Sequence, residues 1–180
     1  MTRAKEKAVA NACGRTVDVV TSEVDRRFGS GDVSGAVQCI RHALTLSPTL
    51  TSMHVGLGDV LATTVHLEEA AAAYQSAIRQ APRSMDIYYR MGMLYGGQDQ
   101  TAQARSSFQA AVSLSPNSVE SLFALGICMS LEHDWFEAER HIRRVLRLRP
   151  GHESARFDLA VALQQLKRPQ EALSSYDGCL

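Results

Sequence analysis

The residue types that most often carry chemistry are scattered along this chain and do not stand at ligand spacings. The six histidines include no pair at positions i and i+4 with the intervening glutamate of zinc proteases. The densest polar triple, Glu132-His133-Asp134, falls at a predicted turn between two helices, where a solvated turn is the better interpretation. The sequence therefore predicts no metal site.

Patterns for phosphate binding and nucleophilic catalysis are also missing from the sequence. The glycine clusters Gly29-Ser30-Gly31 and Gly96-Gly97 follow no predicted strand and lack the Lys-Ser/Thr of a phosphate-binding loop. The serines and histidines show no spacing typical of a nucleophile and its base, although such groups need not be close in sequence. We therefore expect no catalytic residue, no cofactor and no enzymatic activity within these residues.

The cysteines and the apolar segments indicate a compartment. Cys13, Cys39, Cys128 and Cys179 are separated by 26, 89 and 51 residues, so no zinc or redox pair spacing occurs. No apolar stretch reaches 18 residues, and charges interrupt the first ten, so we predict neither a membrane span nor a secretory signal. These features favour a cytoplasmic protein with reduced thiols.

Composition narrows the function classes further. The 180 residues are 45% hydrophobic, and the 19 basic residues balance the 19 acidic residues. A neutral chain lacks the basic excess that favours nucleic acid or a membrane surface as partner. A disordered chain would need lower hydrophobicity and a higher net charge. The composition fits a folded, helix-rich protein.

A period of 34 residues organises the chain. Four prolines recur at this interval, and an alanine stands twelve residues before each of them and once more at the next step. These positions are Pro48, Pro82, Pro116 and Pro150, with Ala36, Ala70, Ala104, Ala138 and Ala172. A large apolar residue follows each alanine by four positions: Ile40, Tyr74, Phe108, Ile142 and Tyr176. Fixed-period self-similarity of this kind indicates a repeat array.

Each period reads as a pair of antiparallel helices. Apolar residues at i, i+4 and i+7 line one helix face. Small residues on the partner helix, Gly58, Gly92, Gly126 and Ala160, let the two backbones approach closely. Proline cannot continue a helix, so the residue before each proline is expected to end one, namely Ser47, Ala81, Ser115 and Arg149. The next helix then begins behind a cap such as Ser118.

These columns resemble the tetratricopeptide repeat. The resemblance implies an all-α, right-handed α-solenoid of antiparallel helix pairs with 34-residue repeats. We expect a partial helix in residues 1–16 and an array in residues 17–180, divided as 17–50, 51–84, 85–118, 119–152 and a truncated 153–180. Two departures stand out: Glu23-Val24 replaces the Leu-Gly pair of the first repeat, and the single tryptophan, Trp135, falls in a predicted turn.

The resemblance also implies a binding groove lined by the first helix of each pair. Carried onto this sequence, the groove positions hold six acidic residues, one basic residue and a set of apolar residues. The partner-binding candidates are Asp18, Asp25, Asp59, Asp86, Tyr89, Arg90, Met93, Glu120, Phe123, Ile127, Phe157, Asp158 and Val161. An apolar floor with an acidic rim suits a basic or amphipathic segment of a protein partner. Alternatively, the acids are only solvated and the apolar residues pack between repeats.

The second helix of the fourth repeat carries a basic stripe. Arg140, Arg143, Arg144 and Arg147 recur at helical spacing, with Glu137 and Glu139 nearby. Phosphate contacts are conceivable there, but a solvated outer face is the better interpretation, so nucleic acid is not the expected partner.

The sequence indicates a protein-binding scaffold or adaptor. One alternative is a non-catalytic recognition or oligomerisation module of a larger enzyme, and another is a self-assembling structural protein. The array stops inside a second helix with no polar capping helix, so we expect a fragment of a longer chain, or a short protein whose open repeat ends self-associate.

Overall fold

Helices alternate with short turns through the computed structural model, which describes residues 19–64 and 66–177. A helix over residues 19–29 comes first. It is followed by α2 (Val33–Leu46), α3 (Thr51–Thr63), α4 (Leu67–Gln80), α5 (Met85–Gly96), α6 (Thr101–Leu114), α7 (Val119–Leu131), α8 (Trp135–Leu148), α9 (Glu153–Gln165) and α10 (Pro169–Asp177). These ranges contain no strand, so the predicted all-α class is confirmed. The partial helix expected in residues 1–16 lies outside the described residues.

The residues predicted to end helices do so. Ser47, Ala81, Ser115 and Arg149 are the C-caps of α2, α4, α6 and α8. In each case the backbone N–H of the cap donates to the carbonyl four residues earlier, at 2.8 to 2.9 Å. The proline that follows has no N–H to donate, so the helical hydrogen bonds stop at this point.

Side chains also fix where two helices of the fourth pair begin. The Ser118 hydroxyl accepts from the N–H of Ser121 at 3.2 Å, as predicted for the cap of α7. The Asp134 carboxylate accepts from the N–H of Glu137 at 3.2 Å and caps α8. Because this cap precedes it, Trp135 is the first residue of α8, and the expectation that it lies in the turn was wrong.

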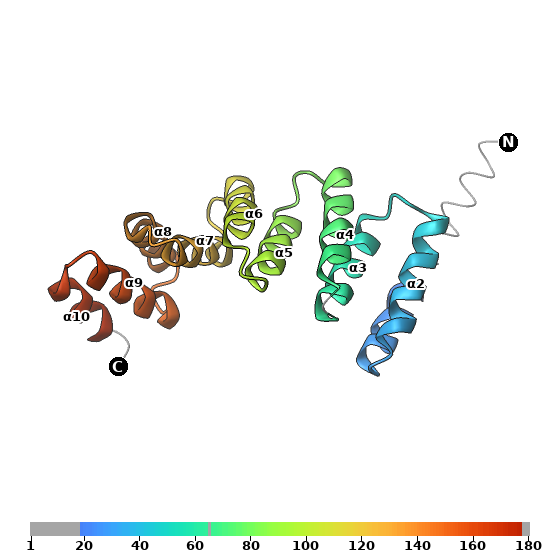
Figure 1. Ribbon diagram of the computed structural model, residues 1–180, viewed down its shortest axis with the longest axis horizontal. Coiled ribbons are helices and arrows are strands. Elements are labelled where there is room, and N and C mark those ends of the chain that lie inside the picture. Colours follow the sequence, from blue (N-terminus) through green and yellow to red (C-terminus); the bar gives the residue numbers. More distant parts are fainter. Residues whose placement is uncertain (1–18, 65, 178–180) are drawn as a thin grey trace. The chain divides into compact units, whose positions relative to one another are not determined.

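Contacts divide the chain into two units, Met1–Pro82 and Arg83–Leu180. In the first unit α3 packs against both α2 and α4. In the second unit each helix from α5 to α10 packs against the next, and α7 also contacts α9. Figure 1 shows this pairing, for example α3 beside α4 and α5 beside α6.

Each unit has its own apolar core. In the first, a buried cluster comprises Val24, Ala36, Ile40, Ala43, Met53 and Val60. In the second, the largest fully buried side chains include Leu122, Leu125, Ile142, Val145 and Leu163. The 34-residue columns therefore mark helix faces that are removed from water, which is the main source of stability for such helices.

Close helix approach depends on the glycine column. A Cβ atom placed on Gly58 would lie 2.5 Å from the Tyr74 ring, and one on Gly92 would lie 2.6 Å from the Phe108 ring. The same atom on Gly126 would lie 2.9 Å from Ile142. Real Cβ atoms do not approach so closely, so a side chain at these three positions would force the facing side chain to move.

The substitution Gly92→Ala is expected to lower the free energy of unfolding by about 1–3 kcal/mol, because the added methyl overpacks the Phe108 ring. The clash outweighs the roughly 1 kcal/mol that alanine gains over glycine in a helix. Urea denaturation followed by circular dichroism measures the change. Gly56→Ala is the control, since its nearest atom would be 4.0 Å away, and it should stabilise the chain. Equal effects of the two substitutions would contradict the prediction.

Candidate functional site

The structure describes two of the three predicted site residues of the first unit. Asp18 lies outside the described residues, and Asp25 is exposed. Asp59 is half-buried, and its carboxylate accepts a hydrogen bond of 2.7 Å from the Tyr74 hydroxyl. Because Tyr74 is buried, this carboxylate has a role inside the helix pair, in satisfying the phenol.

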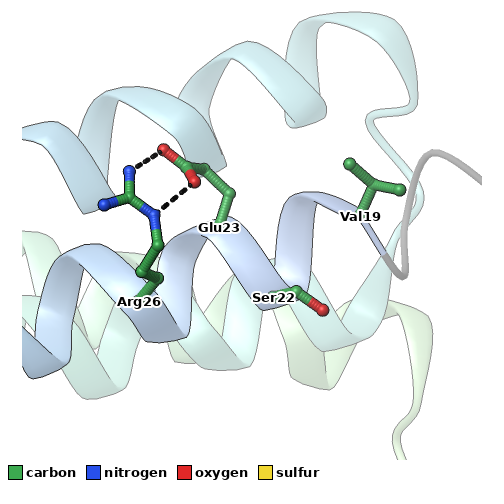
Figure 2. A pocket seen from close by; sticks show the side chains of 4 residues that line it. All are labelled: Val19, Ser22, Glu23 and Arg26. Carbon is green, nitrogen blue, oxygen red and sulfur yellow. Dashed lines mark hydrogen bonds and ion pairs between the residues drawn. The ribbon is translucent and has the colours of Figure 1, made fainter.

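A hollow of about 410 Å³ on the helix over residues 19–29 is lined by Val19, Ser22, Glu23 and Arg26 (Figure 2). Glu23 accepts two hydrogen bonds from the Arg26 guanidinium, at 2.7 and 2.8 Å. With a further hydrogen bond from Arg27, they lower the pKa of Glu23 to about 2. Both charged groups of the hollow are thus already paired with each other, and we do not consider it a binding site.

The second unit carries the other predicted residues on α5, α7 and α9. We call this set the first-helix surface: Asp86, Tyr89, Arg90 and Met93 on α5, Glu120, Phe123 and Ile127 on α7, and Phe157, Asp158 and Val161 on α9. Phe123 contacts the His152 ring, which directly precedes α9, with ring centroids 4.7 Å apart. The contact joins α7 to the start of α9 within the surface.

The aromatic residues of the first-helix surface are held by neighbouring rings. Tyr89 lies 5.6 Å from Phe108, and Phe157 lies 5.9 Å from Tyr176, between ring centroids. Such tilted and edge-on contacts fix ring orientation. Tyr89 is half-buried, whereas Phe157 remains 56% exposed. On α5, Met93 is 54% exposed, so large apolar side chains reach solvent from two helices of the surface.

Two of the three acidic residues of the first-helix surface form ion pairs with an arginine. On α5 the Arg90 guanidinium donates to Asp86 at 2.8 Å. On α7 the Glu120 carboxylate accepts a hydrogen bond from Arg149 at 3.2 Å. A hydrogen bond with the backbone of Glu120 itself, together with this ion pair, lowers the pKa of the carboxyl. Asp158 on α9 has no ion pair with a basic side chain among residues 19–64 and 66–177. The acidic character predicted for the whole groove is therefore concentrated at α9 in this unit.

A hollow of about 340 Å³ opens at the start of α9. Its described lining is Glu153, Ser154, Phe157 and Asp158. Burial raises the pKa of the Asp158 carboxyl above its ordinary value, and the nearby His152 offsets only part of this. Burial therefore disfavours the charged form of this half-buried carboxyl.

The substitution Asp158→Asn is expected to stabilise the chain slightly at neutral pH, by less than about 1 kcal/mol because the site is partly exposed. The raised pKa means that ionised Asp158 lowers stability above its folded pKa. The gain should therefore vanish as the pH falls below the ordinary aspartate value, where both folded and unfolded chains are protonated. Thermal unfolding at pH 7 and pH 3 measures it. A gain that grows on acidification would contradict the assignment.

Some residues of this region are not among the candidates that the sequence pattern indicates. Ser154 occupies the second position of its repeat, which is a groove position, but it is neither charged nor apolar and was not selected. Glu153 stands one residue earlier, outside the groove spacing. His152 also caps α9, since its Nδ1 accepts from the N–H of Ala155 at 3.2 Å. The proline-to-helix spacing carried a signal for a cap here, but the contact with Phe123 depends on packing.

Acidic neighbours pair with two arginines of the basic stripe of α8. Arg140 pairs with Glu137, and Arg143 pairs with Glu139, both at 2.7 Å. Glu139, which we expected on a solvated face, is buried, with 7% of its surface exposed. It is covered because Arg168, at the turn before α10, also binds it at 2.7 Å. Through Glu139, the stripe is thus linked to the turn before α10.

Two further properties concern the described part of the chain. Within it, no cluster of three or more histidine, cysteine, aspartate or glutamate residues is arranged to hold a metal ion. None of its helices combines the length and the apolar character needed to cross a bilayer.

Sequence comparison with protein families decides the classification. One profile with the description "Tetratricopeptide repeat" matches residues 21–84 and 133–178, and a second matches residues 86–118. The first profile alone covers more than half of the chain. The chain is a tetratricopeptide repeat protein. A search of curated proteins finds no matching sequence.

Solved structures share the tetratricopeptide repeat fold. A MamA protein superimposes with a TM-score of 0.84 at 18% identity, over 93% of this chain and 91% of the other. YrrB, a tetratricopeptide repeat protein with an unusual peptide-binding site, gives 0.77 at 22%, over 96% and 90%. PilF of Pseudomonas aeruginosa gives 0.78 at 19%, over 93% and 77%. At these identities the likeness establishes the solenoid fold, not a shared partner.

Proposed function

We propose that the chain is an interaction scaffold or adaptor, and that the first-helix surface of its second unit binds a segment of a partner protein. The exposed apolar side chains of Met93 and Phe157 carry this proposal. They stand on helices whose buried residues already form the core, and more than half of each of these two side chains is exposed to solvent. Exposed apolar groups on a rigid support are typical of interaction sites.

Pre-organisation of the aromatic residues supports the same function. Tyr89, Phe123 and Phe157 each contact a neighbouring ring before any partner arrives. Side chains that are already ordered lose little conformational entropy on binding, and aromatic residues contribute disproportionately to interfaces. The surface therefore suits recognition of an extended peptide or an amphipathic helix.

Membership of the family is a second line of support. Tetratricopeptide repeats are protein-interaction modules, and the similarly folded YrrB has a peptide-binding site. For this chain the choice of surface and of partner class is our proposal.

The test selects ligands from a phage-displayed library of random peptides on the full chain and measures their affinity by calorimetry. Met93→Ala and Phe123→Ala are each expected to weaken the selected peptides by about 1–3 kcal/mol, since they remove apolar contacts at the centre of the surface. The matched control is Phe136→Ala, because Phe136 is 68% exposed on α8, a second helix. It should leave affinity unchanged.

Two results would count against this surface. One is retention of full affinity in both surface variants, which would place the site elsewhere. The other is equal weakening by Phe136→Ala, which would indicate non-specific apolar adsorption. Circular dichroism of each variant separates lost binding from lost folding.

A further inference from the structure

The start of α9 differs electrostatically from the rest of the first-helix surface. The carboxylates of Asp86 and Glu120 are each paired with an arginine. Glu153 and Asp158 line one hollow and have no ion pair with a basic side chain among the described residues. Two anionic groups therefore border one hollow at the start of α9, where a charge supplied from outside could meet them.

An aromatic side chain completes this arrangement. Phe157 lines the same hollow as the two carboxylates and keeps 56% of its surface exposed. Its contact with Tyr176, at 5.9 Å between centroids and 63° between planes, is edge-on. More than half of the ring surface is open to another group, and aromatic ring faces attract cations.

We propose, on the basis of the proposed function above, that the α9 face with Glu153, Phe157 and Asp158 docks a partner segment through one lysine or arginine side chain. The aliphatic stem of that side chain packs on Phe157, and its charged head lies between the two carboxylates. Val161, one turn further along α9, extends the apolar contact for a neighbouring side chain of the segment.

Charge complementarity selects this occupant over the others. The N-terminus of α9 contributes about half a positive charge, which by itself would favour an anion. Two full carboxylate charges outweigh it, so a phosphorylated or acidic segment would be repelled. The raised pKa of Asp158 is consistent with this, because attraction to a cation at this place would offset the cost of burying its carboxylate.

The test uses small probes on the full chain, so that it does not depend on finding a natural partner. Nα-acetyl-arginine methylamide and Nα-acetyl-lysine methylamide are titrated at millimolar concentration while backbone amide resonances of residues 153–161 are followed. Both probes are expected to shift these resonances in a saturable way, and to bind more weakly at 0.5 M than at 0.05 M salt. The norleucine and glutamate analogues should not.

Variants assign the effect to the named groups. The double substitution Glu153→Gln with Asp158→Asn keeps side-chain shape, and we expect it to weaken the cationic probes by about tenfold or more. Phe157→Leu keeps an apolar surface without a π face and should weaken them about threefold. Glu68→Gln removes an exposed carboxylate on α4 and is the control, with no effect expected.

The outcomes separate this inference from the proposed function. Equal shifts from the norleucine analogue, or an unchanged affinity in the double variant, would overturn the cation site even if library peptides bind the surface. Saturable binding of the cationic probes that the double variant loses supports it even if no library peptide binds. Library peptides with no basic residue, bound equally by the double variant, would leave the proposed function standing and refute this inference.

Discussion

Replacing both Arg143 and Arg168 with methionine is expected to destabilise the second unit by about 2–4 kcal/mol, because it leaves the buried Glu139 carboxylate without its ionic partners. In the structure one Glu139 oxygen binds Arg143 and the other binds Arg168, each at 2.7 Å. Only 10% of the Glu139 side chain is exposed, so water cannot replace both guanidinium groups.

Single and control variants sharpen this prediction. Arg143→Met alone should cost clearly less than the double variant, since Arg168 still holds Glu139. Arg140→Met should cost less than about 1 kcal/mol, because the Arg140–Glu137 pair is exposed, with 65% of the arginine side chain in solvent. Urea denaturation followed by the fluorescence of the single tryptophan, Trp135, reports on this unit. Equal losses of stability in the double variant and in Arg140→Met would show that the ion pairs of Glu139 contribute no more than an exposed pair.

Phe108→Ala is expected to lower the free energy of unfolding by about 3–5 kcal/mol, since it empties a site that is 3% exposed. The ring fills the space that Gly92 leaves open and also supports Tyr89 on the first-helix surface. Urea denaturation measures the loss of stability, and calorimetric titration with the selected library peptides measures the loss of affinity. Phe136→Ala, a phenylalanine 68% exposed, should change stability by no more than about 0.5 kcal/mol.

A double-mutant cycle tests the contact itself. Phe108→Leu shortens the side chain, so it should relieve the clash introduced by Gly92→Ala, and the pair should be less destabilising than the sum of the single substitutions. Strict additivity would mean that the two helices adjust independently and that the glycine column is not what sets their approach.

The sequence by itself indicated the helix pairs, the ends of their second helices and the close approach at the glycine column. These features are local or recur at a fixed period: a proline ends a helix through its own missing N–H, and an alanine or glycine column repeats because each pair meets the same steric need. The spacing placed Gly92 and Phe108 in two separate columns, and the structure shows that they face each other.

The choice of ion-pair partners depends on how the helix pairs pack together. Arg149 reaches Glu120 from 29 residues away, and Arg168 reaches Glu139 across the same separation. Long, flexible side chains choose among several neighbours one repeat away, and that choice depends on packing that a repeat pattern does not encode. The pattern therefore predicts an acidic groove, whereas in the second unit Asp86 and Glu120 are paired with arginines, and Asp158 is the acid of the first-helix surface that has no ion pair among the described residues.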